Sequence, residues 1–137
     1  MGYRSEVAIS MFRKDFDRMV KEKGEDIKDL LNYAEHICLH KCESNPDKDV
    51  VVVKWDWIKW YEEYTDIAAV INFLNEYDEE TDEPLVPHIF VRLGEDPEDQ
   101  EYEEQCDWEN NDYDYLDKIR PIHYIETELD DEYTFDI

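Results

Sequence analysis

Residues 50–78 constrain the fold more than any other stretch, because they read as a strand, a turn and a helix without interruption. The valine run 50–53 is β-branched throughout, and apolar side chains then alternate with Lys54 and Asp56, which is the period of a strand with a buried face. After a turn at residues 62–64, Thr65 is suited to cap a helix. That helix has one apolar stripe, made of Ile67, Val70, Ile71, Leu74 and Tyr77.

The remaining patterns place further elements around this unit. Residues 3–12 alternate as a first strand, and residues 87–93 form another strand that ends at Gly94. Residues 14–23 and 25–39 have helical spacing, which predicts two helices, or one helix broken at Gly24. Residues 118–128 alternate as a fourth strand, in which Pro121 favours a sheet edge or a bulge. The order predicts an α+β fold, with two to three helices on one face of a mixed or antiparallel sheet of about four strands.

Length and composition predict one folded domain over residues 1–137, long enough to bury roughly two-thirds of its unfolded surface. Hydrophobic residues at 42% and aromatics at 14% are too many for a disordered acidic chain. There is no apolar run near 18 residues, residues 1–14 lack the long apolar segment of a secretory signal, and three cysteines make no disulfide framework. These features predict a cytoplasmic protein without a membrane span.

Charge is distributed very unevenly along the chain. Residues 1–61 hold 12 acidic and 11 basic side chains, a balance of −1, whereas residues 62–137 hold 27 acidic and 3 basic side chains, a balance of −24. Adaptation to high salt would act on every exposed surface, so it does not explain this asymmetry. Phosphate binding needs Lys and Arg, so the acidic half also argues against nucleic acid as a direct ligand.

An acidic insert at about residues 95–117 contributes much of the excess. Residues 95–114 hold 11 carboxylates and no Lys or Arg. The length of the insert favours a disordered loop. The aromatic residues within it favour a segment folded onto the body, since such side chains normally bury area. Both possibilities remain open at this point.

Four segments together resemble a group of short phage and prophage proteins of unknown function that begin Gly-Tyr-Arg-Ser. The segments are MGYRSEVAIS, WDWIKWYEEYTDIAAVINFL, HIFVRLGED and IHYIETEL. The resemblance covers about half of the chain, and the acidic residues 97–117 depart from it. It implies a viral or mobile-element origin and assigns no role to any residue.

One short motif has the composition of a metal site. His36 and His40, four residues apart on a helix, would share one face as paired zinc ligands do. Cys38 and Cys42 would lie on another face, so all four cannot meet one ion while the helix persists. The weak candidate ligands are therefore His36, His40 and Cys42. The alternative is that the histidines lie near the carboxyl end of a helix, where positive charge is favoured.

No pattern typical of catalysis is present, so we expect neither an enzyme nor a bound cofactor. Three glycines cannot build a phosphate loop, and the serines, cysteines and histidines have no triad or elbow spacing. A calcium loop beginning at Asp107 would need glycine at its sixth position and glutamate at its twelfth, where the chain has Asp112 and Lys118. The tryptophans of residues 55–61 are predicted mainly as core, with Trp60 and Tyr61 as candidates for an exposed contact surface.

The acidic surface is the feature from which we predict function. Carboxylates two apart on a strand lie about 7 Å from one another, so rows of them repeat charge as a nucleic-acid backbone does. Self-repulsion makes such a surface costly, which suggests a basic partner. The prediction is a phage-type nucleic-acid mimic that binds the basic surface of a host nucleic-acid-binding protein in the host cytoplasm and inhibits it, as anti-CRISPR or anti-restriction proteins do. The candidate partner-binding residues are Glu98, Asp99, Glu101, Glu103, Glu104, Asp107, Glu109, Asp112, Asp114, Glu126, Glu128, Asp130, Asp131 and Glu132.

Three other interpretations stay open. The acidic loops could serve only to keep an aromatic-rich domain soluble. The chain could be an acidic protein–protein interaction module without an inhibitory role. It could also be a small metal-binding protein that uses His36, His40, Cys38 and Cys42.

Overall fold

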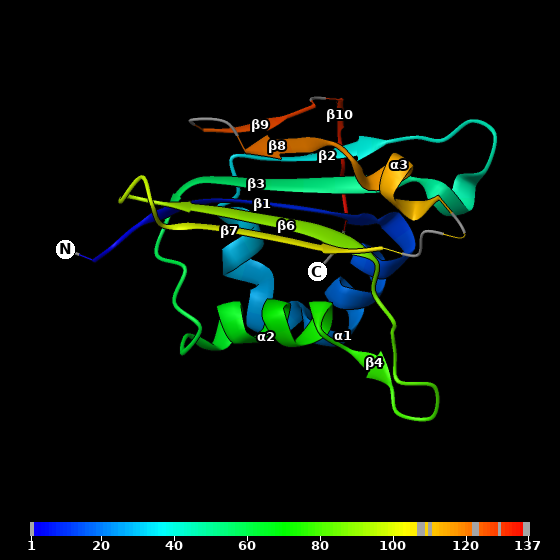
Figure 1. Cartoon of the computed structure of the whole chain (residues 1–137), viewed down its shortest axis with the longest axis horizontal. Coiled ribbons are helices and arrows are strands. Elements are labelled where there is room, and N and C mark those ends of the chain that lie inside the picture. The colour runs from blue at the N-terminus through cyan, green and yellow to red at the C-terminus, as the bar shows by residue number, and fades with distance from the viewer. Residues whose placement is uncertain (1, 107–108, 110, 122–123, 129, 136–137) are drawn as a thin grey trace.

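A computed structural model describes residues 2–106, 109, 111–121, 124–128 and 130–135. Across these residues, six strands form one antiparallel sheet in the order β10-β2-β3-β1-β6-β7 (Figure 1). The strands are β1 (Ser5–Phe12), β2 (His36–His40), β3 (Val50–Ile58), β6 (His88–Gly94), β7 (Gln100–Gln105) and β10 (Asp131–Glu132). Two long helices, α1 (Arg13–Asn32) and α2 (Thr65–Leu74), lie together below this sheet in Figure 1.

Smaller elements fill the connections. They are the 3₁₀ turn η1 (Pro46–Lys48), the hairpin of β4 (Tyr77–Asp78) and β5 (Glu83–Pro84), the short helix α3 (Asp112–Leu116), and the hairpin of β8 (Ile119–Pro121) and β9 (Ile125–Thr127). Helix α3 and the β8–β9 hairpin lie on the opposite side of the sheet from α1 and α2 (Figure 1).

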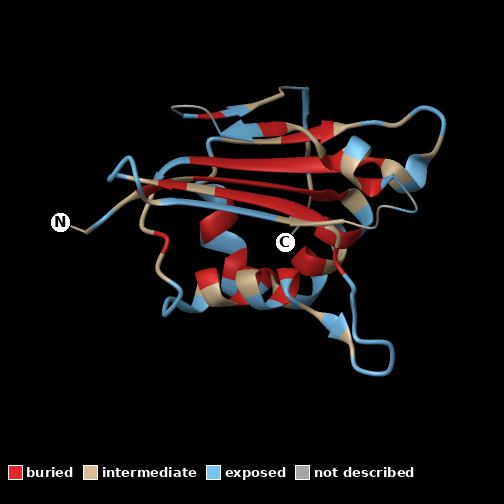
Figure 2. Ribbon diagram, in the orientation of Figure 1, coloured by how far each residue is buried: buried red, intermediate tan, exposed pale blue. Residues whose placement is uncertain are grey.

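The central strands are buried on both faces because alternate side chains meet two different layers (Figure 2). In β1, Ile9 stands opposite Val53 of β3 on one side and Phe90 of β6 on the other. Val51, Val53 and Trp55 face the long helices, whereas Val50 and Val52 face the layer formed by α3 and the β8–β9 hairpin. The β-branched valine run suits this doubly covered position.

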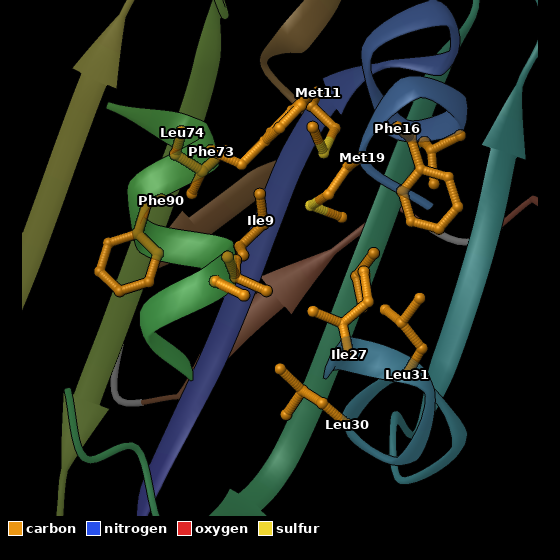
Figure 3. Packing of buried hydrophobic residues seen from close by; sticks show 14 of the residues in the cluster. Ile9, Met11, Phe16, Met19, Ile27, Leu30, Leu31, Phe73, Leu74 and Phe90 are labelled. Carbon is orange, nitrogen blue, oxygen red and sulfur yellow. The ribbon is translucent and has the colours of Figure 1, made fainter. Parts of the chain in front are cut away.

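The main core lies between the sheet and the two long helices (Figure 3). Helix α1 contributes an apolar stripe that includes Phe16, Met19 and Ile27, and α2 contributes Phe73 and Leu74. Burial of such side chains stabilises a fold by about 1.5–3 kcal/mol each. The C-terminal segment closes one side of this core, because the rings of Tyr133 and Phe135 pack edge-on against Phe16 at 5.8 Å and 5.1 Å.

A second, smaller core lies on the other face of the sheet. Leu116, Ile119 and Ile125 cover apolar side chains of β1, β3 and β6. The hydroxyl of Ser10 on β1 donates a hydrogen bond to the carbonyl oxygen of Leu116 at 2.7 Å, which fixes the end of α3 against the sheet. The acidic insert is therefore built into the fold at both of its ends, through β7 and through α3.

The predicted α+β architecture is confirmed, with the long helices on one face of the sheet. The strand and helix expected within residues 50–78 occur as β3 and α2, and the strands expected at residues 3–12 and 87–93 occur as β1 and β6. The sheet has six strands in the described residues rather than about four. Helix α2 begins at Thr65 itself, after Tyr64 at the cap position, so the predicted capping role of Thr65 is wrong.

The prediction of a helix over residues 25–39 is wrong at both ends. Helix α1 runs without a break through Gly24, which is buried, and it ends at Asn32. Residues 36–40 are instead strand β2, which pairs with β3 in the register Cys38 to Val52. A five-residue segment whose apolar positions fit either period takes the form that completes the sheet, because pairing with β3 satisfies its backbone groups.

Two further predictions are corrected. The described residues of the range 118–128 form not one strand but two paired strands, β8 and β9, in which Arg120 stands opposite Glu126. Trp60 is buried against Trp55 and Phe90 and does not form a contact surface. Within the part of the chain that the structure describes, no helix is long and apolar enough to cross a membrane.

Candidate protein-binding edge

Strand β7 forms one edge of the sheet and carries the densest group of predicted partner-binding residues. It pairs with β6 in the register Glu101 to Arg92 and Glu103 to Phe90. Glu101 and Glu103 point to the helix side, where they border a small cavity with Phe90 and Leu74. Tyr102 and Glu104 point to the opposite side, since side chains alternate along a strand. The strand thus presents carboxylates on both faces of the edge.

Arg92 anchors this edge. Its Nη2 atom lies 2.6 Å from Oδ1 of Asp99 and 2.7 Å from Oε1 of Glu101, and its Nε atom donates to the same Oε1 atom at 3.0 Å. The hydroxyl of Tyr3 donates to Oδ2 of Asp99 at 2.7 Å. The Arg92 guanidinium, together with the Tyr3 hydroxyl, holds the pKa of Asp99 below its ordinary value. Asp99 and Glu101 are therefore committed in part to holding β7 on β6.

The carboxylates of Glu98, Glu103 and Glu104 are engaged less. Glu98 is exposed in the turn before β7, and no ion pair joins it to any described residue. Oε1 of Glu103 lies 3.4 Å from Nε2 of the fully buried His88. Glu104 accepts a hydrogen bond from the hydroxyl of Tyr102 at 2.9 Å, and burial followed by this bond raises the pKa of Tyr102. Among the described residues, no Lys or Arg forms an ion pair with any of these three carboxylates of the β7 edge.

The predicted partner-binding residues after β7 differ in their exposure to solvent. Asp112 is buried, and its Oδ1 atom accepts a hydrogen bond from Nζ of Lys48 at 2.7 Å, so its assignment to a partner-binding surface is wrong. Glu109 and Asp114 are exposed. Asp107 lies outside the described residues. Only part of the acidic insert can therefore contribute to an accessible surface.

The remaining predicted residues lie away from β7. Asp131 and Glu132 form β10, which pairs with β2 at the other edge of the sheet, about 24 Å from β7 at the usual strand spacing. Glu126 is exposed on the β8–β9 hairpin. Two further carboxylates of this group already have partners: Glu128 lies 3.2 Å from Arg120, and Asp130 lies 3.5 Å from Nδ1 of His40. The predicted residues that the structure describes therefore do not form one patch.

The geometry of β2 removes the basis of the predicted zinc pair. On a strand, His36 and His40 lie about 13 Å apart, too far to bind one ion. Nε2 of His36 is 3.0 Å from the hydroxyl of Thr127, and Nε2 of His40 is 2.9 Å from the carbonyl oxygen of Glu128. Cys38 is buried, and Sγ of Cys42 is 3.4 Å from the hydroxyl of Ser44. Among the described residues, no three His, Cys, Asp or Glu side chains are grouped so that they could hold a metal ion.

Two features of the structure were not predicted from the sequence. The first is the role of Arg92 and Tyr3 at the β7 edge; the scarcity of cations in the acidic half marks Arg92 as unusual, but nothing in the sequence points to Tyr3. The second is a pocket of about 460 Å³ beside the end of β3 and the start of α2. Trp57 lines it and is 59% exposed, because it extends the helix-facing row of β3 beyond the cover of the helices.

Comparison of the chain with models of protein families, with curated proteins and with solved structures found no match. Function is therefore inferred from the charge and geometry of the β7 edge.

Proposed function

We propose that this protein binds a basic nucleic-acid-binding protein through the β7 edge and keeps DNA or RNA from that protein. The observation that carries the proposal is the placement of Glu98, Glu103 and Glu104 along one ordered edge of the sheet. They belong to the half of the chain that holds the −24 balance. A basic groove that accepts phosphates would accept these carboxylates, which lie on both faces of the edge and in the turn before it, and would be occupied by them.

The order of the β7 edge supports this proposal. Arg92 and the ladder to β6 fix the strand in the free protein, so binding would not have to order the acidic segment first. The net charge of −25 would also attract a basic partner over a distance and speed encounter at low salt. The resemblance of the chain to short phage proteins fits an inhibitor of a host defence enzyme, such as a CRISPR effector or a restriction enzyme.

A structural explanation competes with this function. Exposed sheet edges are commonly protected by charged side chains, which prevent pairing with other chains. On that explanation the carboxylates of β7 serve solubility alone, and no specific partner exists.

Affinity capture from a bacterial lysate with two matched triple variants separates these explanations. The edge variant replaces Glu98, Glu103 and Glu104 with Gln, and the control replaces Glu79, Glu80 and Glu83, which are exposed near the β4–β5 hairpin. Each variant loses three negative charges, so the two variants have the same net charge. Proteins retained at increasing salt are identified by mass spectrometry and are then challenged with added DNA or RNA.

We expect the native chain and the control variant to retain the same nucleic-acid-binding protein, and the edge variant to lose it. Added DNA or RNA should release the retained protein. Equal loss with both variants would show that overall charge rather than the β7 edge matters. Retention that nucleic acid does not affect would favour an interaction module without mimicry, and no specific retention would leave solubility as the explanation.

A further inference from the structure

The outer side of β7 is an open backbone edge. The N–H of Gly94 donates to the carbonyl oxygen of Asp99 at 2.8 Å, which sets the phase of the antiparallel ladder between β6 and β7. Because bonded and non-bonded pairs alternate, the backbone groups of Glu101 and Glu103 point toward β6. Those of Gln100, Tyr102 and Glu104 point outward. No other described segment pairs with this side of β7.

The charge of the edge selects what can pair with it. If two copies paired through β7 with Tyr102 opposite Tyr102, Glu101 of one copy would stand opposite Glu103 of the other, and like charges directly opposite are destabilising. A strand with Lys or Arg at alternate positions would reverse the sign of this interaction. Glu101 and Glu103 occupy the non-bonded positions of the open side, where opposite side chains come closest. Both hydrogen bonds that Arg92 donates to Glu101 are accepted by Oε1. Arg92 therefore does not occupy the Oε2 atom of Glu101.

We propose that β7 accepts an extended basic segment of the partner as a seventh, antiparallel strand of the main sheet. This inference rests on the proposed function and specifies how the partner binds. Lys or Arg side chains of the added strand lie opposite Glu101 and Glu103, and a residue between them lies opposite Tyr102. The backbone of the added strand bonds to Gln100, Tyr102 and Glu104, as in other complexes formed by strand addition.

A synthetic heptapeptide tests the proposal directly. The probe is Lys-Val-Lys-Tyr-Lys-Val-Lys with both ends blocked, so that its central Tyr lies opposite Tyr102 and its inner lysines lie opposite Glu101 and Glu103. In one derivative the second, fourth and sixth residues are N-methylated, which removes the N–H groups that face β7. In the matched derivative the third and fifth residues are N-methylated, which removes N–H groups that face away. All three peptides carry the same charge.

We expect methylation at the second, fourth and sixth residues to weaken binding by about tenfold or more, because three backbone bonds are lost. Methylation at the third and fifth residues should leave the Kd nearly unchanged. Equal affinity of all three peptides, or no binding of the parent peptide, would overturn strand addition. The lysate experiment can still succeed in that case, so failure of this inference is distinct from failure of the proposed function.

Two measurements on the protein complete the test. Strand addition should slow amide hydrogen exchange at Gln100, Tyr102 and Glu104 when the parent peptide binds, whereas a purely electrostatic contact would not. Tyr102→Pro removes an outward N–H group that the ladder to β6 does not use, and Tyr102→Ala removes the same ring but keeps the N–H. We expect Tyr102→Pro to bind the parent peptide several-fold more weakly than Tyr102→Ala. Equal binding by the two variants would contradict the proposal.

Discussion

Nζ of Lys48 lies 2.7 Å from Oδ1 of Asp112, and both side chains are largely enclosed. Lys48 belongs to the turn η1 before β3, whereas Asp112 begins α3. The ammonium group also lies over the ring of Phe12, 4.9 Å from its centroid. This one contact therefore joins the start of the chain, the connection to β3 and the end of the acidic insert.

Lys48→Ala should destabilise the fold strongly, because it leaves the carboxylate of Asp112 buried without its counter-charge. Removal of one partner from a buried ion pair costs about 3 kcal/mol or more. Lys41→Ala is the control, since Lys41 is exposed and forms no ion pair with a described residue, and it should change the free energy of unfolding by less than about 0.5 kcal/mol. Urea unfolding of the three proteins measures the difference. Similar stability of both variants would show that Asp112 does not depend on Lys48.

Asp15→Asn should stabilise the protein at pH 7. Asp15 is buried in the first turn of α1, its Oδ2 atom has no hydrogen-bond partner, and burial raises its pKa above 3.8. A folded-state pKa above the unfolded value means that the folded protein binds this proton more tightly, so the penalty from Asp15 is present above the folded pKa and is relieved as the pH falls toward 3.8.

The stability advantage of Asp15→Asn over the native chain should therefore shrink as the pH is lowered from 7. Thermal unfolding of both proteins across this range measures the difference. Asp26→Asn, at an exposed position in the same helix, serves as the control. A constant difference between Asp15→Asn and the native chain at every pH would mean that Asp15 does not titrate abnormally.

Carboxylates along the β7 edge should differ in their effect on stability. Asp99→Asn weakens the ion pair with Arg92, so it should lower the free energy of unfolding by about 1 kcal/mol once its partial exposure is taken into account. Replacement of Glu98, Glu103 and Glu104 with Gln should keep or raise Tm, because it relieves repulsion among like charges. Because the pKa of Asp99 is depressed, its contribution is present at neutral pH and is lost as the pH falls through that pKa. Calorimetry at pH 7 compares the variants, and a higher Tm for Asp99→Asn would contradict the anchoring role.

Gly94→Ala should loosen the β7 edge. A methyl group at this position would collide with Oδ2 of Asp99 and the hydroxyl oxygen of Tyr3, and it would lie 2.8 Å from Cγ of Asp99. We expect a loss of about 1–3 kcal/mol and faster hydrogen exchange in β7. Gly2→Ala is the control, because its methyl group would meet the far ends of the Lys59 and Tyr61 side chains, neither of which belongs to β7. Unchanged exchange in β7 would show that the edge accommodates the methyl group.

Local sequence patterns predicted the elements whose hydrophobic period is long and unambiguous. Strand β3 and helix α2 have such patterns, and both were found where they were expected. Strand β2 was mistaken for helix because five residues cannot distinguish the two periods, and its pairing with β3 decides the outcome. Strand β7 has polar residues on both faces, so no alternation of polarity marks it.

Contacts between residues that are distant in the chain could not be predicted from the sequence. Tyr3 meets Asp99 only because β1 and β7 both flank β6, and the register of both pairings sets that meeting. Likewise, burial of Asp112 depends on Lys48, a residue from another part of the chain. A carboxylate in an acidic segment looks the same in the sequence whether it faces solvent or a buried lysine. The charge of the acidic insert was therefore predictable, and the division of its carboxylates between structural and accessible roles was not.

The packing of Phe135 and Tyr133 against Phe16 has a consequence for biosynthesis. Phe16 is synthesised before the rings that pack against it, because those rings belong to residues more than 100 positions later in the sequence. A nascent chain shorter than about 135 residues holds this apolar site uncovered, and exposed apolar surface of this kind is what chaperones bind and what aggregation exploits. The core around Phe16 is therefore completed only after residues 133–135 have been synthesised and have packed onto it.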